Sequence, residues 1–297
     1  MNKLKVVVVG NCQARPLATY LEMLNSDIEI TAVLIVHLLK DDDLDQYDVL
    51  LESADIIISQ LVFDTYHCNF VKTSYLKQKY GNKVTSVVNL FFSGYFPDFI
   101  YIREPSKGPL SGPLLDYHCK TILEGWYQGG SIDSAVFKLG STEYFESNYS
   151  TSIVDSLLEL KKREKLVDIN ICDFIEDNYK KSQLFFTMNH PCKKLLVEYS
   201  SRILTHLDLG ASFSDALQKL SEPLDPIIIP PAPNVYSKSI ERTYSGFEVC
   251  NLKSWYSEKG ARRDYNTVDL VGAYYQLYDA NKDILIPMID QKPELLC

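Results

Sequence analysis

The sequence predicts an α/β protein with a mostly parallel, three-layer sheet and a helical insertion or subdomain. Strand-like runs alternate with helical patterns along the first hundred residues, and right-handed crossovers are the rule for such an order. The first run, residues 4–9, reads Leu-Lys-Val-Val-Val-Val. A nearly continuous apolar, β-branched run is typical of a central strand that is buried on both faces of the sheet.

A helix is expected directly after this first strand. Gly10 supplies backbone freedom for the turn, Asn11 is a good N-cap residue, and Pro16 fits a first helical turn. The buried stripe of this helix is expected to consist of Leu17, Leu21 and Leu24. The turn therefore places Cys12 at the carboxyl end of a central strand and beside the positive end of a helix.

The later elements follow from the same patterns. Further strands are expected at 28–36, 54–60, 83–90, 99–103 and 183–188. Helices are expected at 64–80, 114–130, within 131–163, at 195–204 and at 268–278; residues 41–48 form a loop or short helix, 104–113 a turn-rich loop, and 223–233 an extended, proline-rich segment. We divide the chain into residues 1–104, the first part of the sheet domain, 105–181, a helical insertion, and 182–297, which returns to the sheet domain and adds C-terminal segments.

Composition and charge narrow the class of partner. The 297 residues are 46% hydrophobic and carry a net charge of −9, with a pI near 5.1. Such an acidic chain argues against nucleic acid or an anionic membrane as the main partner. The sequence runs directly into the first strand and contains no stretch approaching a membrane span, so we expect a cytoplasmic protein without a signal peptide.

The seven cysteines are odd in number and scattered, without CxxC pairs. This pattern predicts neither a disulfide framework nor a structural zinc site, and the histidines also lack metal-ligand spacing. We therefore expect no metal cofactor and mostly reduced, buried cysteines. Only Cys12 has a local context that predicts reactivity.

A ligand crevice is expected where the parallel strands end, because ligands of such sheets bind outside the carboxyl ends of the strands. Cys12, Gln60 and Asn89 would face it. A helix N-terminus lowers a thiol pKa, so Cys12 is a candidate nucleophile, with the backbone N–H groups of Cys12 and Gln13 as oxyanion donors. The alternative is a small residue packed in a tight turn. The tripeptide Gly-Asn-Cys is also similar to the Gly-Asp-Ser turn of SGNH-type esterases, and the expected sheet is SGNH- or Rossmann-like.

His190 is the preferred general base, since it follows a second strand end and an imidazole titrates near neutral pH. The alternative is that His190 or Asn189 only caps the helix that Pro191 begins. His118 is the rival base. A dinucleotide site is disfavoured because the first turn lacks the second and third glycines of the Gly-x-Gly-x-x-Gly pattern, and no Walker loop is present.

These segments together resemble the WcbI family of polysaccharide biosynthesis enzymes, capsule-associated acetyltransferases that bind coenzyme A. The likeness covers roughly residues 5–205 and rests on Gly10-Asn11-Cys12-Gln13, on residues 54–60, on Asn89 with the following Gly94-Tyr95 and Pro97-Asp98, and on Asn189-His190-Pro191. It implies an O-acetyltransferase that moves acetyl from acetyl-CoA to a sugar hydroxyl of a capsular or surface glycan. Cys12 would carry the acetyl group as a thioester, or His190 would drive direct transfer beside it.

The resemblance also implies binding roles for the surrounding side chains. Coenzyme A carries phosphates that require basic groups. The cofactor-binding candidates are Arg15, Arg103, Lys107 and Ser111, with Arg262 and Arg263 as a second choice. The candidates for oxyanion or substrate binding are Asn11, Gln13, Gln60, Asn89 and Asn189. Two other classes stay open, namely an SGNH-like or thiol-dependent carbohydrate esterase and a non-catalytic module that binds a glycan or nucleotide-sugar.

Overall fold

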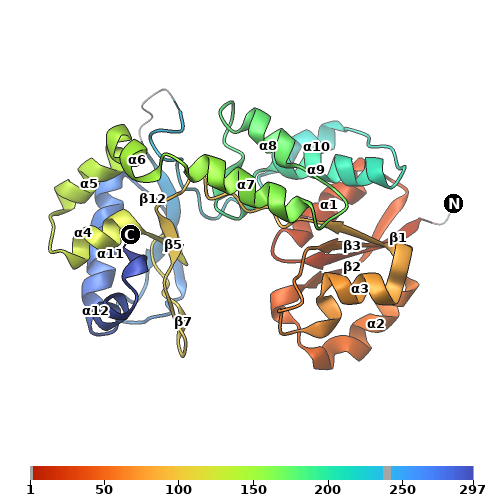
Figure 1. Ribbon diagram of the computed structural model, residues 1–297, viewed down its shortest axis with the longest axis horizontal. Helices are drawn as coiled ribbons and strands as arrows, with labels where there is room; N and C mark the ends of the chain where they lie inside the picture. The colour runs from red at the N-terminus through yellow and green to blue at the C-terminus, as the bar shows by residue number, and fades with distance from the viewer. Residues whose placement is uncertain (1–2, 237–241, 297) are drawn as a thin grey trace. The chain divides into compact units, whose positions relative to one another are not determined.

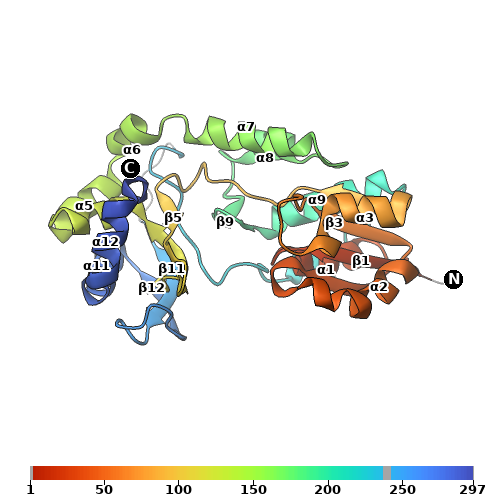
Figure 2. The same ribbon diagram turned by 60° about the horizontal axis from the view of Figure 1, so that its bottom comes forward.

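The computed structural model describes residues 3–236 and 242–296, so Cys297, one of the seven cysteines, lies outside the described residues. The chain divides into two compact units. Unit 1 comprises Met1–Phe92, Ser156–Phe185 and Asn189–Leu224, and unit 2 comprises Ser93–Asp155, Phe186–Met188 and Asp225–Cys297. Figures 1 and 2 show the elements of both units. The predicted α/β fold class is confirmed.

Unit 1 contains the predicted parallel sheet. Its strands are β1 (Leu4–Gly10), β2 (Ile28–Ile35), β3 (Ile56–Gln60) and β4 (Val84–Val87), in the order β2-β1-β3-β4. The strand β1 pairs in parallel with β2 on one side and β3 on the other. Its residues Val6 to Val9 are at most 1% exposed. The first apolar run is therefore the central, fully buried strand that the sequence predicts.

Helices cover both faces of this sheet. Figure 1 shows α1 (Ala14–Leu24) with α9 (Lys193–His206) on one side, and α2 (Leu44–Ser53) with α3 (Thr73–Tyr80) on the other. Alternate side chains of β1 point to opposite faces of the sheet. Val7 and Val9 pack in the core cluster that contains Leu51 of α2 and Leu76 of α3. The result is the expected three-layer arrangement, with the carboxyl ends of the strands at one edge.

The segment 156–185 belongs to unit 1, the unit that contains the parallel sheet. We had assigned most of it to a helical insertion at residues 105–181. The carboxylate of Asp168 accepts hydrogen bonds from the backbone N–H and the hydroxyl of Ser86, both at 2.7 Å. Ile169 forms a parallel bridge with Val87 at the edge of β4. These contacts attach α7 (Ser152–Glu164), which starts in unit 2, and α8 (Cys172–Asn178) to the sheet, and α10 (Asp215–Lys219) completes the unit.

Two predicted helices are shorter than expected. The helix predicted at 64–80 begins only at Thr73, because the Asp41 carboxylate accepts from the Asn69 backbone N–H and amide and holds that segment in a short 3₁₀ turn. The helix predicted at 114–130 starts with β8 (Tyr117–Cys119), which pairs antiparallel with β5 (Phe99–Tyr101), and only then becomes α4 (Lys120–Tyr127). A long-range strand partner overrides the helical pattern there.

Unit 2 combines small antiparallel sheets with helices. Beside the β5–β8 pair it contains β6 (Arg103–Glu104) with β7 (Gly108–Pro109), and the hairpin of β11 (Tyr244–Val249) with β12 (Lys259–Tyr265). The sequence did not predict this hairpin or the helix α12 (Lys282–Gln291). The remaining helices are α5 (Ile132–Gly140), α6 (Thr142–Tyr149) and α11 (Thr267–Ala280). Short 3₁₀ turns lie at Val36–Leu38, Asp41–Asp43, Asn69–Val71, Gly81–Lys83 and Pro293–Leu295.

The second strand–turn–helix unit of the sequence is also present. The predicted strand at 183–188 is β9 (Phe185–Thr187), which a short turn connects to β10 (His190–Pro191), and α9 follows directly. Segment 223–233 was expected to be extended, but it contains turns at 223–224 and 233 and a bend at 226–227. Its only strand-like contact among the described residues is a bridge between Ile228 and Ser245.

Candidate active site

The turn after β1 is built on a close approach between Gly10 and Gln60. A Cβ on Gly10 would lie 2.3 Å from Gln60 Oε1, so the position needs glycine for space, whereas the sequence suggested conformational freedom. The backbone N–H of Asn11 donates to the same Gln60 oxygen at 2.8 Å. This hydrogen bond attaches the turn that contains Cys12 to Gln60, the last residue of β3.

Asn11 was expected to be the N-cap residue of the first helix, but it lies two residues before the N-cap. The N-cap residue of α1 is Gln13, and Asn11 Oδ1 accepts from the Gln13 backbone N–H at 2.9 Å. The Asn11 side chain therefore closes a short turn before the helix begins. One of the two N–H groups expected to hold an oxyanion is already engaged inside this turn.

Gln13 is the buried centre of the site, with only 1% of its surface exposed. Its Nε2 donates to the carbonyl oxygens of Leu90 and Asn189, both at 2.7 Å. Its Oε1 accepts from Leu90 N at 2.9 Å and from Gln60 Nε2 at 3.1 Å. One amide thus connects the ends of β1, β3 and β4 with the turn before β10, and it brings Gln13, Gln60 and Asn189 together as predicted. Its four contacts make Gln13 a positioning residue.

Arg163 holds the next predicted residue, Asn89. Its Nη1 donates to Asn89 Oδ1 at 2.8 Å and to the Asn89 carbonyl at 3.1 Å, and its Nη2 donates to the Phe91 carbonyl at 3.3 Å. Arg163 belongs to the charged run 159–165 of α7, yet it is half-buried. Helical spacing could have indicated this position. Arg163 lies three residues after Leu160, which is buried, and therefore on the inner face of α7.

A pocket of about 250 Å³ opens at the carboxyl ends of the strands. We call it the strand-end pocket. The polar side chains of Asn11, Gln60 and Asn89 line it together with Phe63, Thr65 and Tyr66. Cys12 is not among its lining residues in the described chain, although its neighbour Asn11 is. The crevice expected at this edge of the sheet is therefore present.

Burial changes the chemistry of Cys12. The sequence predicted a lowered pKa, and this was wrong. Burial raises the pKa of the Cys12 thiol above its ordinary value, and the backbone N–H groups of Cys12 and Gln13 oppose the shift only in part. Loss of solvation on burial outweighs these donors. The thiol is protonated at neutral pH and needs a base to become a nucleophile.

His190 provides a base in the same unit. The expectation that His190 titrates near neutral pH was wrong. Burial lowers the pKa of His190 from 6.5 to about 4, so its imidazole is neutral at pH 7. Neither His190 nor Asn189 caps the helix α9, which was the alternative role expected for them. Cys192 is the N-cap residue of α9, and the first helical N–H, that of Lys193, donates to the Glu222 carboxylate at 2.6 Å.

The turns that carry Cys12 and His190 are joined directly. The 2.7 Å hydrogen bond from Gln13 Nε2 to the Asn189 carbonyl connects a neighbour of Cys12 with a neighbour of His190. Each candidate catalytic residue is therefore next in sequence to a residue of this partly buried hydrogen bond. The arrangement suits acyl transfer, in which a thiol and an imidazole exchange a proton.

His118, the rival base, is fully buried in unit 2 and both of its ring nitrogens are engaged. Nε2 lies 3.0 Å from the Leu110 carbonyl, which can only accept, so Nε2 carries the proton and Nδ1 accepts from the Tyr278 hydroxyl at 3.0 Å. Burial lowers the pKa of His118 to about 4. Its contacts fit a structural role.

The basic candidates are distributed over both units. Arg15 is exposed on α1 and follows the Cys12 turn in unit 1. Arg103, Lys107 and Ser111 belong to unit 2, where Ser111 is buried and its N–H donates to the Trp255 carbonyl at 2.9 Å. The second-choice pair is occupied locally: Arg262 donates to the Asp225 carbonyl at 3.0 Å, and the Arg263 guanidinium lies 4.8 Å from the Tyr265 ring centre.

Comparison with known proteins decides the family. A family model described as polysaccharide biosynthesis enzyme WcbI matches residues 5–212. The chain belongs to the WcbI family of polysaccharide biosynthesis enzymes. This confirms the resemblance, whose motifs all lie within the matched range. No curated protein matches the chain.

A solved structure has the same fold. It is WcbI, described as a novel polysaccharide biosynthesis enzyme, in a native form without a disulfide bond between coenzyme A and one of its cysteines. It is 18% identical to this chain, with a TM-score of 0.70, and the match covers 95% of this chain and 91% of that one. The similarity therefore extends over both units.

Residues 3–236 and 242–296 contain no group of three or more His, Cys, Asp or Glu residues placed to hold a metal ion. No helix in the same residues has the length and apolar character needed to cross a membrane.

Proposed function

We propose that the protein is an O-acetyltransferase that moves acetyl from acetyl-CoA to a sugar hydroxyl of a capsular or surface polysaccharide, or of its precursor. The observation that supports this most strongly is the hydrogen bond from Gln13 to Asn189, which connects the turns of Cys12 and His190. Membership of a polysaccharide biosynthesis family supports a glycan as the acceptor.

Coenzyme A as the donor is supported by the similar structure, whose description names coenzyme A together with a cysteine. In unit 1 of this chain, the other described cysteines, Cys68, Cys172 and Cys192, are buried, whereas Cys12 is half-exposed. Cys12 is therefore the thiol of unit 1 that a thioester can approach. The neighbouring Arg15 supplies a positive charge for a phosphate group.

Cys12 and His190 perform the two halves of the proposed reaction. His190 takes the Cys12 proton, Sγ attacks the acetyl carbonyl, and the carbon–sulfur bond to coenzyme A breaks. His190 then gives the proton to the departing coenzyme A thiolate. In the second half, His190 takes the proton of the sugar hydroxyl, whose oxygen attacks the acetyl-cysteine, and the Cys12 thiolate leaves and recovers that proton. The products are the O-acetyl sugar and free coenzyme A.

The two pKa values set the resting protonation of the two groups. A raised Cys12 pKa keeps the resting thiol neutral, and a His190 pKa of about 4 keeps the imidazole unprotonated at neutral pH. Protonated His190 is then a strong acid, which favours transfer of its proton to a leaving thiolate. In direct transfer, the alternative route, His190 deprotonates the sugar and the sugar oxygen attacks acetyl-CoA while Cys12 only lines the site.

The test is intact-mass spectrometry after incubation with acetyl-CoA. We expect one added acetyl group on the wild-type protein and none on Cys12→Ser. Cys250→Ser is the matched control, since Cys250 is an exposed cysteine in unit 2, and it should retain the modification. An unmodified wild type that still acetylates a glycan acceptor supports direct transfer. Failure to bind coenzyme A, with hydrolysis of an aryl acetate in its absence, contradicts the transferase and supports the esterase.

A further inference from the structure

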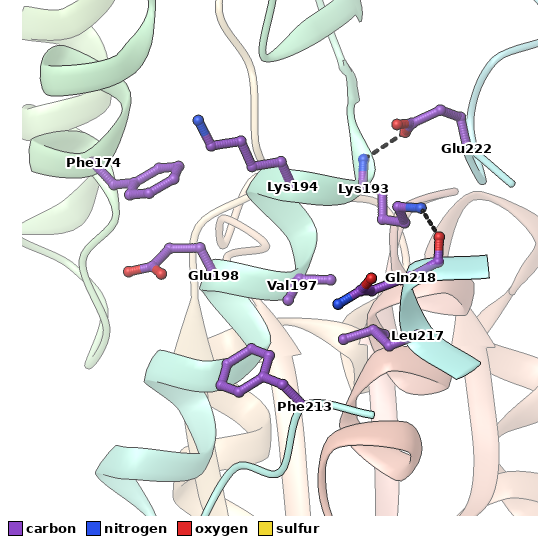
Figure 3. A pocket seen from close by; sticks show the side chains of 9 residues that line it. All are labelled: Phe174, Lys193, Lys194, Val197, Glu198, Phe213, Leu217, Gln218 and Glu222. Atoms are coloured by element: carbon purple, nitrogen blue, oxygen red, sulfur yellow. Dashed lines mark hydrogen bonds between the residues drawn. The ribbon is translucent and has the colours of Figure 1, made fainter. Parts of the chain in front are cut away.

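A second pocket lies among the helices of unit 1 and shares no lining residue with the strand-end pocket. We call it the helical pocket. Figure 3 shows its walls, with Phe174 from α8, Val197 from α9, Leu217 and Gln218 from α10, and Phe213 from the segment before α10. Its volume of about 390 Å³ falls in the range of small-molecule sites.

Hydrogen bonds hold the α9 and α10 walls in place. The Lys193 Nζ donates to the carbonyl oxygens of Gln218 at 3.1 Å and Leu220 at 2.6 Å, which satisfies acceptors at the end of α10. The Lys193 backbone N–H donates to Glu222, as Figure 3 also shows. Phe174 of α8 forms another wall, and the Lys194 ammonium of α9 lies 5.7 Å from its ring centre. The pocket is therefore a feature that a network of specific contacts maintains.

The charges of the helical pocket balance. The lining contains two lysines, Lys193 and Lys194, and two glutamates, Glu198 and Glu222, and Glu198 is further paired with Arg202 at 2.8 Å. A balanced lining is a poor site for a polyanion such as the phosphates of coenzyme A. A neutral ligand suits it better.

The uncharged groups indicate a ligand with both polar and apolar faces. Phe213 is 66% exposed and Phe174 is half-buried, so both rings offer apolar surface to a ligand. The Gln218 side-chain amide, which Figure 3 shows beside Leu217, offers a donor and an acceptor. Sugars combine C–H faces, which stack on aromatic rings, with hydroxyls, which bond to amides and charged groups.

Chain continuity places this pocket near the proposed base. α9 begins two residues after β10, so Lys193 lies three residues beyond His190. Consecutive Cα atoms are 3.8 Å apart, so the Cα atoms of His190 and Lys193 are separated by at most about 11 Å. A glycan chain that enters the helical pocket can therefore present a neighbouring sugar to His190.

We propose that the helical pocket binds a neutral sugar unit of the acceptor glycan, adjacent to the unit that is acetylated. The identity of the ligand as an acceptor rests on the proposed function, whereas the binding of a neutral sugar does not. Phe213 supplies the stacking surface and Gln218 the polar contacts, so that the pocket selects the acceptor and the strand ends perform the transfer.

The experiment measures binding of maltotriose, cellotriose and diacetylchitobiose to the full-length protein by saturation-transfer NMR and calorimetry. We expect at least one of the three to bind. Phe213→Ala should weaken that binding by up to about tenfold, the equivalent of an aromatic contact, and Gln218→Ala should also weaken it. Phe137→Ala is the matched control, because Phe137 is 77% exposed on α5 in unit 2, and it should leave the affinity unchanged.

The outcomes separate this proposal from the proposed function. Absence of binding by all three sugars, or sugar binding that Phe213→Ala leaves intact, overturns the sugar site. Phe213-dependent binding of hexanoate or pantetheine in place of sugar overturns it too, because the pocket would then be a hydrocarbon site. Coenzyme A affinity, measured on the same samples, should not change in Phe213→Ala. If sugar binds but coenzyme A does not, the transferase is contradicted and the sugar site stands.

Discussion

Replacing Gln13 by leucine tests whether one buried amide holds the candidate active site together. Leucine has a similar size but neither donates nor accepts hydrogen bonds. The substitution therefore removes the contacts of Gln13 with Leu90, Asn189 and Gln60, and it leaves their buried partner groups without an acceptor or donor. We expect a less stable unit 1 and a separation of the turns that carry the proposed catalytic residues.

The magnitude follows from four hydrogen bonds that join elements distant in the chain. Each such bond contributes about 1 kcal/mol net, so the loss should be about 4 kcal/mol. In a domain of this size, that loss lowers the melting temperature by roughly 8 to 16 °C. The proposed acetyl transfer should fall further than stability explains, because the hydrogen bond from Gln13 to the Asn189 carbonyl no longer joins the turns of Cys12 and His190.

The assay is urea denaturation followed by far-UV circular dichroism. Both tryptophans, Trp126 and Trp255, lie in unit 2, so their fluorescence reports unit 2 and is not a probe of unit 1. Gln78→Leu on the exposed surface of α3 is the matched control and should change the midpoint little. A Gln13→Leu midpoint equal to that of Gln78→Leu would refute the positioning role.

Three other substitutions or titrations check separate parts of the structure. Gly10→Ala should destabilise unit 1 by about 1 to 3 kcal/mol, because its Cβ meets the Gln60 side chain; Gly140→Ala, with open space around its Cβ, should not, as denaturant midpoints will show. Arg163→Met should cost about 1 to 3 kcal/mol in the same assay by releasing the carbonyls and amide that it binds, whereas equal midpoints for wild type and variant would contradict the clamp. Histidine ring signals in NMR should place the pKa of His118 near 4, and since the folded pKa is depressed, stability is present above pH 6.5 and falls as the pH drops toward 4, by about 2 kcal/mol for His118 at pH 5. A titration midpoint near 6.5 would contradict its burial.

The sequence by itself determined the sheet and the location of the site. The apolar run of β1 needs burial on both faces, and parallel strands end at one edge, so Cys12, Gln60 and Asn89 were expected to meet there. Gln60 and Asn89 line one pocket at that edge, whereas Asn11 lines it in place of its neighbour Cys12. The ordered motifs around Cys12 and His190 were also sufficient to predict the family. These properties depend on local periodicity and on the order of motifs, which a sequence records directly.

Only the tertiary structure decided how the site is held and charged. Gln13 and Asn189 are 176 residues apart, and no local pattern shows that one amide joins them. The Cys12 pKa is raised because desolvation exceeds the effect of the nearby N–H groups, and this balance depends on packing by distant segments. The β8 strand likewise replaced a predicted helical turn once β5 was its neighbour. Burial and long-range partners are properties of the folded chain, so they set the chemistry at positions that the sequence had already marked.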